Sequence, residues 1–413
     1  MKNNRTFLEK LLDGAEVEWK TLDEIFHLKN GYTPSKGVKE YWENGSIPWF
    51  RMEDIRENGR VLNTALQKVS ESAVKGGKLF PANSIILSTT ATIGEHALVQ
   101  VEHLSNQQLT NFSIKEEFLK CLDIKFAFHY FFLIGNQIKK SANFSSLPIV
   151  SSKDLKKIQM PIPPLSVQTE IVKILDALTA LTSELTSELI LRRKQYEYYR
   201  ETLLLPDNLE QLNTEGAKKK LSDVVNIYLG LTYTPTYVEN GVKFISAQNT
   251  SNDFLDLSNT KFISREEFEK STSNAKPKRG DILFTRVGSN LGHPVIVDTD
   301  EDLCIFVSLG FLRVKDKNTL NSYIKHWMNT NLFWKQVEKN VHGSAKVNLN
   351  TGWLKDFEIY IPTLKEQQCI VSILDKFETL TNSINEGLPL AIEQSQKRYE
   401  YYRELLLNFP DRE

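Results

Sequence analysis

The sequence has little cysteine and no long apolar run. Its three cysteines, Cys121, Cys304 and Cys369, are odd in number and far apart, which argues against a disulfide framework and fits a reducing cytosol. No run of about 18 apolar residues is present, so no transmembrane helix is expected. The apolar stripe between Phe7 and Leu12 is too short for a signal-peptide core. We therefore expect a cytoplasmic protein.

An excess of charge of one sign is also missing. The net charge is −1 over 413 residues, which counts against a protein that coats nucleic acid without sequence preference. Lys218–Lys220 and Lys276–Arg279 are local basic runs, and taken alone each is better explained as a solvated turn. A length of 413 residues allows two or three domains, and 40% hydrophobic residues are typical of a soluble globular protein.

Signatures of catalysis are absent from the sequence. There is no G-x-x-x-x-G-K-[ST] loop for nucleotide hydrolysis. The only Pro-Pro pair follows Ile162, so the Asn/Asp-Pro-Pro-Tyr/Phe motif of adenine methyltransferases is missing. The histidines and cysteines show no metal-ligand spacing, and His96 with His103 is a poor candidate pair. We expect no catalytic residue, no metal site and no cofactor bound by this chain.

The chain contains an internal repeat. The segment Tyr196–Glu201 recurs letter for letter as Tyr399–Glu404, and six such residues do not recur by chance. Upstream, Ile162–Asp176 resembles Ile361–Asp375. The offset grows from 199 (176 to 375) to 203 (196 to 399), a difference of four residues that nearly preserves a helical face.

The earlier parts of the two halves agree more weakly. The matched segments are Tyr32–Ser35 with Tyr233–Thr236, Glu43–Gly45 with Glu239–Gly241, and Ser145-Ser146 with Ser344-Ala345. Each half therefore has a variable part, 17–163 or 218–362, followed by a similar part, 164–205 or 363–409.

The similar parts have the apolar spacing of long helices. Leu165–Leu204 forms one stripe of 40 residues, about 60 Å of helix, and a helix of this length needs a partner. The second copy, Leu364–Leu407, offers that partner, although Gly387 and Pro389 should kink or interrupt it. We expect the two to pair as a coiled coil; the alternative is that each helix packs on its own domain.

The variable parts have an α+β pattern. Ser84–Ser88 and Asp281–Thr285 are short apolar runs after turn residues and indicate strands. Ile124–Ile138 and Leu320–Val337 indicate helices. The polar stretch Pro206–Gly216 is typical of a linker.

This organisation resembles the specificity subunits of type I restriction-modification systems. The motifs that carry the resemblance are Met160–Leu165 with Gln168, Ile171 and Val172; Ile359–Pro362 with Leu364, Gln367 and Gln368; the two Tyr-Glu-Tyr-Tyr-Arg blocks; Glu18–Leu22; and Gly45–Trp49. They span essentially the whole chain, and their order and duplication are more specific than any one of them.

The resemblance implies a fold and a set of partners. The fold is α+β: two similar globular target-recognition domains, separated by a pair of long antiparallel coiled-coil helices, in an internal pseudo-twofold repeat. The implied boundaries are 1–163 for the first recognition domain, 164–205 for the central spacer helix, 206–217 for a linker, 218–362 for the second recognition domain and 363–413 for the C-terminal spacer helix.

The resemblance also implies how such a chain works. Each recognition domain reads one half of a split site in double-stranded DNA, and the helices set the distance between the half-sites. Two modification subunits dock on the helices, and restriction subunits join for cleavage. The chain itself is non-catalytic; S-adenosylmethionine, ATP and magnesium belong to the partner subunits.

Base reading needs side chains that reach groove edges, with small polar groups on phosphates. In the first half the candidates are Arg51, Thr89, Thr90, Gln107, Gln108 and Ser145; in the second they are Gln248, Asn249, Arg286, Ser289, Asn290, Lys346 and Asn348. Arg286, in a glycine-bearing loop, is the strongest single candidate. An ion pair with Glu53 or Asp54 would explain Arg51 equally well, and an ordinary loop explains Gln107 and Gln108 somewhat better.

The repeated tyrosine blocks supply candidates for subunit contact: Tyr196, Tyr199, Arg200, Tyr399, Tyr402 and Arg403. Packing inside the helix pair explains the tyrosines as well as contact with a modification subunit does, and both roles are compatible with one side chain.

Three other functions stay open. An enzyme would need a cofactor loop or an acidic metal cluster, which the sequence does not show. A coiled-coil scaffold that never touches DNA has no need of two large variable domains. A specificity subunit of a methylation-only system has the same sequence features as the first interpretation.

Overall fold

Each half of the chain is bracketed by two short strands that pair with each other. In this computed structural model, β1 (Glu18–Thr21) pairs antiparallel with β10 (Gln159–Ile162). In the same way β11 (Ala217–Lys220) pairs with β20 (Glu358–Ile361). The structure describes residues 6–90, 92–142, 150–211, 216–271, 273–288, 290–340, 348–382 and 386–409. Each half therefore closes on itself before its long helix begins.

The first half contains two further sheets, with strand orders β2-β9-β6-β7-β4 and β5-β3-β8. Their strands are β2 (Phe26–Asn30), β3 (Ile47–Phe50), β4 (Val61–Leu62), β5 (Lys68–Val69), β6 (Ser84–Ser88), β7 (His96–Val99), β8 (Leu104–Ser105) and β9 (Leu109–Ile114). The strand predicted at Ser84–Ser88 is confirmed as β6. Ile85 and Leu87 enter one core and Ile86 another, because successive side chains point to opposite faces.

The helices of the first half are α1 (Phe7–Leu12), α2 (Leu22–Ile25), α3 (Met52–Asn58), α4 (Ile124–Ala142) and α5 (Ser152–Lys157). The helix predicted at Ile124–Ile138 is confirmed as α4. It buries Phe126 and Phe131 against the sheet, where Phe131 lies edge-to-face with Phe112 of β9 at 4.9 Å between ring centroids.

The second half has a similar arrangement of two four-stranded sheets, with strand orders β12-β19-β16-β17 and β13-β15-β14-β18, in place of the five- and three-stranded sheets of the first half. Its strands are β12 (Val225–Leu229), β13 (Tyr237–Val238), β14 (Val242–Ile245), β15 (Lys261–Ile263), β16 (Ile282–Thr285), β17 (Pro294–Ile296), β18 (Leu303–Ile305) and β19 (Leu309–Val314). The strand predicted at Asp281–Thr285 is confirmed as β16. In both halves the central strand pairs antiparallel with its two neighbours.

The helices of the second half are α8 (Leu221–Val224), α9 (Arg265–Lys270), α10 (Asn321–Met328), α11 (Asn331–Asn340) and α12 (Thr351–Leu354). The prediction of one helix over Leu320–Val337 is wrong, because α10 and α11 are separate. The Thr330 hydroxyl accepts a hydrogen bond from the Phe333 N–H and donates one to the Trp327 carbonyl, so it ends one helix and starts the next.

The long helices are α6 (Leu165–Leu203), α13 (Leu364–Asn382) and α14 (Gly387–Leu407). The long helix predicted from Leu165 is confirmed, and so is the interruption of its second copy. Gly387 has φ +80°, and a Cβ there would lie 2.6 Å from the Thr379 carbonyl oxygen, so only glycine fits this turn. The segment predicted as a linker, Pro206–Gly216, contains the short helix α7 (Pro206–Gln211), which buries Leu209.

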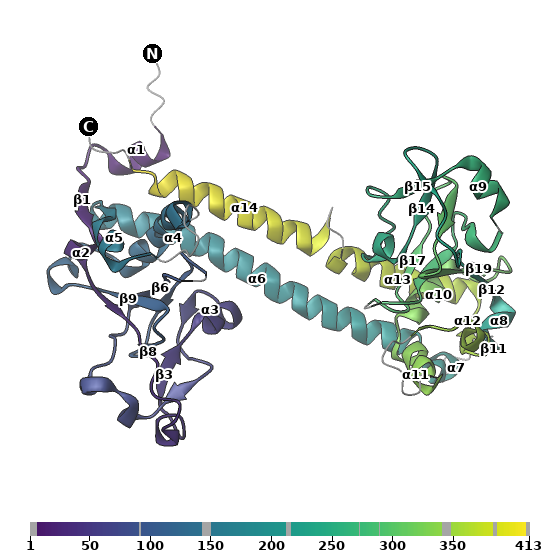
Figure 1. Ribbon diagram of the computed structural model, residues 1–413, viewed down its shortest axis with the longest axis horizontal. Helices are drawn as coiled ribbons and strands as arrows, with labels where there is room; N and C mark the ends of the chain where they lie inside the picture. Colours follow the sequence, from purple (N-terminus) through teal and green to yellow (C-terminus); the bar gives the residue numbers. More distant parts are fainter. Residues whose placement is uncertain are drawn as a thin grey trace, which may run out of the picture. The chain divides into compact units, whose positions relative to one another are not determined.

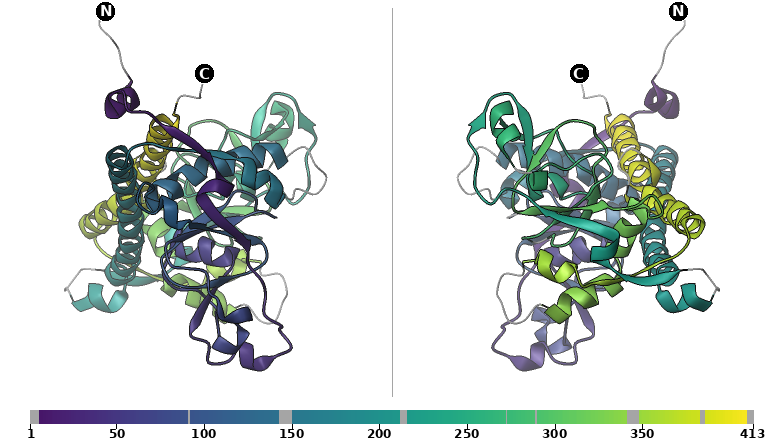
Figure 2. Two further views of the ribbon diagram at one scale, coloured as in Figure 1. Left: turned by 90° about the vertical axis from the view of Figure 1, so that its left-hand side faces the viewer. Right: turned by 90° about the vertical axis from the view of Figure 1, so that its right-hand side faces the viewer.

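The chain divides into two compact units, residues 1–183 with 393–413 and residues 184–392. Within the first unit, α6 and α14 lie side by side: the Thr182 and Ser395 hydroxyls are 2.8 Å apart, and Ile171 near the start of α6 shares a core with Leu406 near the end of α14 (Figure 1). The two helices are therefore antiparallel. Helix α1 lies beside the same end of α14 (Figure 2), where Leu8 joins this core.

Within the second unit, α6 runs antiparallel to α13. Arg193 donates a hydrogen bond to the Thr381 carbonyl, at 3.5 Å, and Tyr199 stacks on Phe377 one turn earlier in α13, with ring centroids 5.4 Å apart. The expected α+β fold with two similar domains and antiparallel paired helices is confirmed.

Candidate functional site

In each half one glycine lies very close to a neighbouring backbone carbonyl. These two contacts show that the halves share one backbone arrangement, which we call the frame. A Cβ on Gly31 would lie 2.2 Å from the Ser105 carbonyl oxygen, and a Cβ on Gly230 would lie 2.2 Å from the Phe306 carbonyl oxygen. No other residue type fits either position without moving the backbone. Both glycines follow the edge strand of the main sheet, so they are structurally equivalent.

The residue after each glycine fixes the alignment of the halves. The Tyr32 N–H donates to the Ser105 carbonyl at 2.7 Å, and the Leu231 N–H donates to the Ile305 carbonyl at 2.9 Å. Leu231 is thus the counterpart of Tyr32. The sequence match of Tyr32 with Tyr233 is wrong by two residues, because identical letters there occupy different places in the frame.

In the first half, the described DNA-reading candidates lie where three loops meet, after β3, after β6 and between β8 and β9. After β3, the Arg51 N–H donates to the Asp54 carboxylate at 2.7 Å. After β14, the Ser246 N–H donates to the Asn249 side-chain oxygen at 3.0 Å. Ser246 therefore stands where the first half has Arg51.

The other two loops are joined by matching backbone hydrogen bonds. The Thr89 N–H donates to the Gln108 carbonyl at 3.2 Å, and the Arg286 N–H donates to the Ser308 carbonyl at 2.8 Å. Thr89 is equivalent to Arg286, and Gln108 to Ser308. The same backbone arrangement thus carries different side chains in the two halves. We call the place where these three loops meet the corner of each half.

Arg51 is half-buried at the corner of the first half. Its guanidinium carbon lies 5.5 Å from the Trp49 ring centroid, and its Nε is 3.9 Å from the Glu53 carboxylate. That Nε is buried without a hydrogen-bond partner among the described residues. The ion pair proposed as an alternative role is therefore long.

Gln107 and Gln108 are exposed and border a hollow of about 640 Å³ beside Arg51. The Gln107 side-chain oxygen accepts from the Thr33 hydroxyl, and that of Gln108 accepts from the Asn106 amide at 3.2 Å. The hollow is lined by Thr33, Lys36, Lys39, Trp42, Glu43, Trp49, Arg51, Gln67, Asn106, Gln107 and Gln108. Cationic, amide and aromatic groups thus meet at one concave place.

Thr89 and Thr90 lie at the back of the same corner. Thr89 is buried, and its hydroxyl points to the Gln108 carbonyl at 3.4 Å. The Thr90 hydroxyl is buried without a hydrogen-bond partner in the described part of the chain. Both side chains are placed to support the loops more than to extend from them.

Arg286 is used inside the second half. Its Nε donates to the Leu349 carbonyl at 3.3 Å, and one terminal nitrogen donates to the Val307 carbonyl at 2.9 Å. Burial lowers the pKa of this guanidinium from its usual value. In this arrangement the side chain ties two loops together; its role as a base reader stays a prediction.

The remaining candidates of the second half differ in exposure. Asn249 is buried, and its amide donates to the carbonyls of Asp256 and Asn259. Asn290 donates to the Ser251 carbonyl at 3.3 Å. Gln248 and Asn348 are exposed at the corner, Asn348 through a bridge to Val287 beside Arg286. The candidates Ser145, Ser289 and Lys346 lie outside the described residues.

Each tyrosine block contributes one tyrosine to a cluster with a histidine and an aspartate. Sequence reasoning did not predict these two matching clusters, which we call the first and second tyrosine junctions. In the first tyrosine junction, the Tyr399 hydroxyl lies 3.3 Å from Nδ1 of His129, whose Nε2 lies 2.9 Å from the Asp176 carboxylate. His129 is 1% exposed. A carboxylate only accepts, so Nε2 donates, and in a neutral ring Nδ1 then accepts from the tyrosine.

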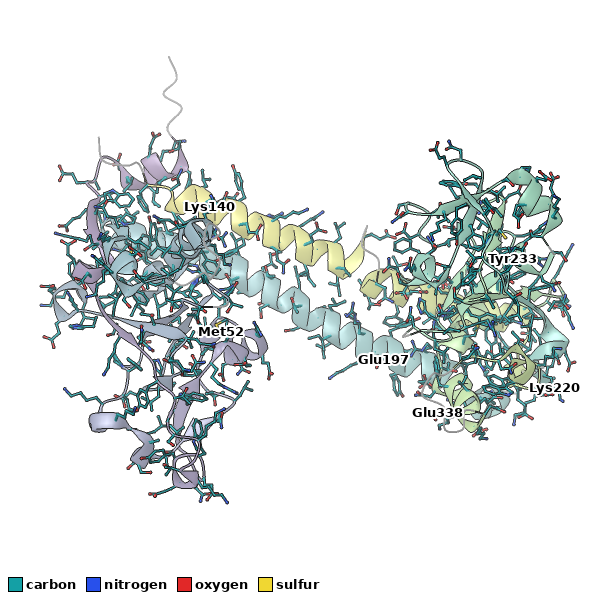
Figure 3. The ribbon with its side chains drawn as sticks, viewed as in Figure 1. Met52, Lys140, Glu197, Lys220, Tyr233 and Glu338 are labelled. Carbon is teal, nitrogen blue, oxygen red and sulfur yellow. The ribbon has the colours of Figure 1, made fainter. Side chains whose placement is uncertain are left out.

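In the second tyrosine junction, the Tyr196 hydroxyl lies 3.3 Å from Nδ1 of His326, and Nε2 of that ring lies 2.7 Å from the Asp375 carboxylate. His326 is fully buried, and Tyr196 is 6% exposed. Figure 3 marks Glu197, the exposed neighbour of Tyr196, on α6. The only feature of the sequence that could have pointed to these two histidines is that each lies in a helix upstream of a repeated block.

The arginines of the two blocks cover the junction tyrosines. Arg200 lies 5.2 Å from the Tyr196 ring centroid, and Arg403 lies 5.4 Å from the Tyr399 ring centroid. Tyr199 and Tyr402 keep more than a third of their surface exposed. Of the residues predicted for subunit contact, these two are therefore the most accessible in the described chain.

One group of possible metal ligands occurs within the described residues. It comprises His326, Asp375 and Glu378. Hydrogen bonds account for its geometry, because His326 donates to Asp375 and Lys325 pairs with Glu378 at 2.6 Å. None of the helices in the described part of the chain combines the length and apolar character needed to cross a bilayer.

The comparisons with known proteins agree with this doubled frame. A family model described as the type I restriction modification DNA specificity domain matches residues 15–192 and 213–394. This chain belongs to the type I restriction-modification DNA specificity family. The EcoprrI specificity subunit of Escherichia coli is 39% identical over 407 residues, covering 92% of each chain, and the EcoR124I/EcoR124II subunit of the same organism is 30% identical over 417 residues, covering 98% of this chain and 97% of that subunit.

Solved structures support the fold of this specificity-family chain. The S subunit of the M. genitalium type I restriction-modification system has a TM-score of 0.51 at 16% identity and covers 97% of this chain and 98% of its own. A chain from a structure of type I complex assembly and conformational transition has a TM-score of 0.61 at 16% identity, with 95% and 98% coverage.

Proposed function

We propose that this chain is the DNA-recognition subunit of a type I restriction-modification complex and reads a split site in double-stranded DNA, one part with each half. The observation that carries the proposal is the repeated corner. Equivalent backbone hydrogen bonds hold Arg51 and Ser246, and Thr89 and Arg286, at the same positions of the two halves. A constant frame with exchanged side chains is what reading two different half-sites requires.

In the first half, we assign base contact to Arg51, Gln107 and Gln108. They border one hollow, they are at least partly exposed, and the buried Nε of Arg51 has no hydrogen-bond partner among the described residues. Arginine and glutamine pair with the edges of guanine and adenine in the major groove. Lys36 and Lys39 on the rim of the hollow suit phosphate contact.

In the second half, we assign base contact to Gln248 and Asn348, the exposed amides at the equivalent corner. Val307, half-exposed in the place of Gln107, suits contact with a thymine methyl group. The second half-site should therefore differ from the first in base sequence.

The partners follow from the same proposal. Two modification subunits would dock on the paired helices, with the exposed faces of Tyr199 and Tyr402 as matching contacts, and restriction subunits would join for cleavage. The chain would do no chemistry itself; S-adenosylmethionine, ATP and magnesium would bind to the partner subunits.

The test is base-resolution mapping of adenine methylation in cells that carry this chain with its modification partner, compared with cells that lack only this chain. We expect a split motif that disappears without the chain. A methylation pattern that stays unchanged, with the partner present and active, would contradict the proposal and favour a scaffold that does not read DNA.

A further inference from the structure

The two tyrosine junctions have the same construction, and each takes its tyrosine and its aspartate from the repeated sequence blocks. In each, a tyrosine hydroxyl faces Nδ1 of a buried histidine at 3.3 Å, and Nε2 of that histidine faces an aspartate at 2.9 or 2.7 Å. Both aspartates come from the repeated block, with an offset of 199 residues. The agreement in geometry indicates one device used twice.

Each junction joins three helices. In the first, His129 comes from α4 of the recognition domain, Asp176 from the start of α6 and Tyr399 from the end of α14. The first domain is thus held by the helix that directly follows it and by the helix that ends the second half.

The second junction takes its three residues from the corresponding helices, with the roles of the two halves exchanged. His326 comes from α10, Asp375 from α13 and Tyr196 from the end of α6, the helix that follows the first domain. In each junction the domain and the aspartate belong to one half of the chain and the tyrosine to the other.

The surroundings of the tyrosines favour a donated hydrogen bond in a fixed direction. Burial raises the pKa of both Tyr196 and Tyr399, so both hydroxyls keep their protons. Arg403 lies 4.8 Å from the Phe132 ring centroid and 5.4 Å from the Tyr399 ring centroid, so it packs against the tyrosine of the first junction. Apolar packing holds the helices, and each hydrogen bond adds a directional constraint on their rotation and register.

We propose that Tyr196 and Tyr399 are reciprocal positioning residues, each of which orients the recognition domain of the other half through its histidine–aspartate pair and thereby sets the gap between the two half-sites. This inference rests on the proposed function. Among the described residues, the hydrogen-bond and ring contacts of Tyr196 and Tyr399 are with junction and helix residues and not with the residues assigned to base contact, so we expect them to act on the gap and not on the base sequence of either half-site.

The experiment measures methylation by the full complex on a library of sites in which the correct half-sites are separated by varied gaps. Tyr399→Phe and Tyr196→Phe each keep the ring and remove one hydroxyl. We expect each to reduce the preference for the native gap over gaps one base pair longer or shorter by about five-fold, the effect of one hydrogen bond. The base preference within each half-site should stay as in the wild type.

Matched controls lie two residues away. Tyr401 and Tyr198 are 63% and 65% exposed, and Tyr401→Phe and Tyr198→Phe remove the same hydroxyl without touching a junction. The controls should change the gap preference by less than about 1.5-fold, within the usual effect of surface substitutions.

A second variant approaches the first junction from the histidine side. His129→Gln should reduce the gap preference as Tyr399→Phe does, and the double variant should be no worse than either one, because both break one unit. Unchanged gap preference in folded variants, multiplied effects in the double variant, or altered base preference would overturn the inference. A wild-type complex with no split motif would instead contradict the proposed function.

Discussion

The two halves of this chain share a frame but differ in the chemistry of their cores. In the first half the buried Asn111 amide donates to the Ser105 hydroxyl at 2.8 Å, and its oxygen lies 3.0 Å from Nε2 of the buried His103. In the second half, strand register places Phe311, Ile305 and Leu303 at these positions. They replace Asn111, Ser105 and His103 in that order, and all three are apolar.

The difference shows which interactions define the frame. A connected polar network and a fully apolar cluster occupy the same place between the same strands. The chemistry of the core thus differs between the halves, whereas the glycine approaches at Gly31 and Gly230 and the anchors of the long helices occur in both. Backbone geometry and these anchors specify the fold, and the core and the corner are free to differ.

The largest expected effect comes from an anchor that both halves share. The buried Gln168 contacts the carbonyls of Cys121 and Pro163 and the Asp123 N–H, and the buried Gln367 makes the same three bonds in the second half, to Asn318, Pro362 and Leu320. Gln168→Ala and Gln367→Ala should each lower the free energy of unfolding of their own half by about 4 kcal/mol, because buried polar groups lose their partners.

Hydrogen exchange on the full chain, read separately for the two halves, measures this effect. Gln368→Ala is the control, since that neighbouring side chain is exposed and should change the free energy by less than about 0.5 kcal/mol. A large loss for one anchor and none for the other would break the equivalence of the two frames.

The next largest expected difference between the halves is the dependence of their stability on acid pH. Burial lowers the pKa of His96 to about 3 and that of His103 to about 4, while the equivalent positions are Pro294 and Leu303, which do not titrate. The unfolded histidines take up protons below their usual pKa of about 6.5, and the folded ones do not until about pH 4 or 3. The stability of the first half should therefore fall by about 3 kcal/mol between pH 6.5 and pH 5.

The measurement is hydrogen exchange of both halves at the two pH values, corrected for the intrinsic exchange rate. His103→Gln removes one titrating group and should roughly halve the acid loss of the first half. Equal acid sensitivity of the two halves, or no change with this variant, would show that these histidines do not cause the difference.

The corner residues should show a smaller difference between the halves. Arg51→Ala should cost about 1–3 kcal/mol at one base pair of the first half-site, because a lost arginine contact relaxes the reading of one base. Ser246→Ala, at the equivalent position, should cost less than about 1 kcal/mol. Methylation rates on sites with each base substituted in turn measure both, and an Arg51 variant with unchanged base preference would remove this residue from the interface.

The smallest expected difference concerns the ion pairs beside the tyrosine junctions. Lys325 and Glu378 form a largely buried pair, with side chains 14% and 16% exposed, whereas Lys125 and Asp176 are 49% and 39% exposed. Lys325→Ala should lower the free energy of unfolding by about 1 kcal/mol more than Lys125→Ala, because solvent screens the exposed pair. Denaturant unfolding of the two variants tests this order, which the reverse result would contradict.

The sequence predicted the elements that depend on local pattern. Short apolar runs after turn residues gave β6 and β16, and helical spacing gave α4 and α6, because these signals lie within each segment. The break between α10 and α11 was missed because it depends on one hydroxyl, that of Thr330, acting at both helix ends. The helix α7 and its buried residue Leu209 were missed because the segment is mostly polar and begins with proline.

The candidate site was predictable in its place more than in its detail. Polar side chains after β3 and β6 pointed to the corner, but Arg286 returns to two backbone carbonyls, which only the folded loop reveals. The tyrosine repeats were evident, yet the partners His129 and His326 are far away in sequence. The register between Tyr32 and Leu231 was mistaken because letters were matched where backbone hydrogen bonds decide.

The central claim is that two halves with one frame read two half-sites independently. The most direct test is to exchange residues 218–362 for the same region of a relative with a different second domain and to map adenine methylation with the modification partner present. The account predicts that one half of the split motif changes while the other half and the gap stay as they were. A change in both halves, or in neither, would contradict it.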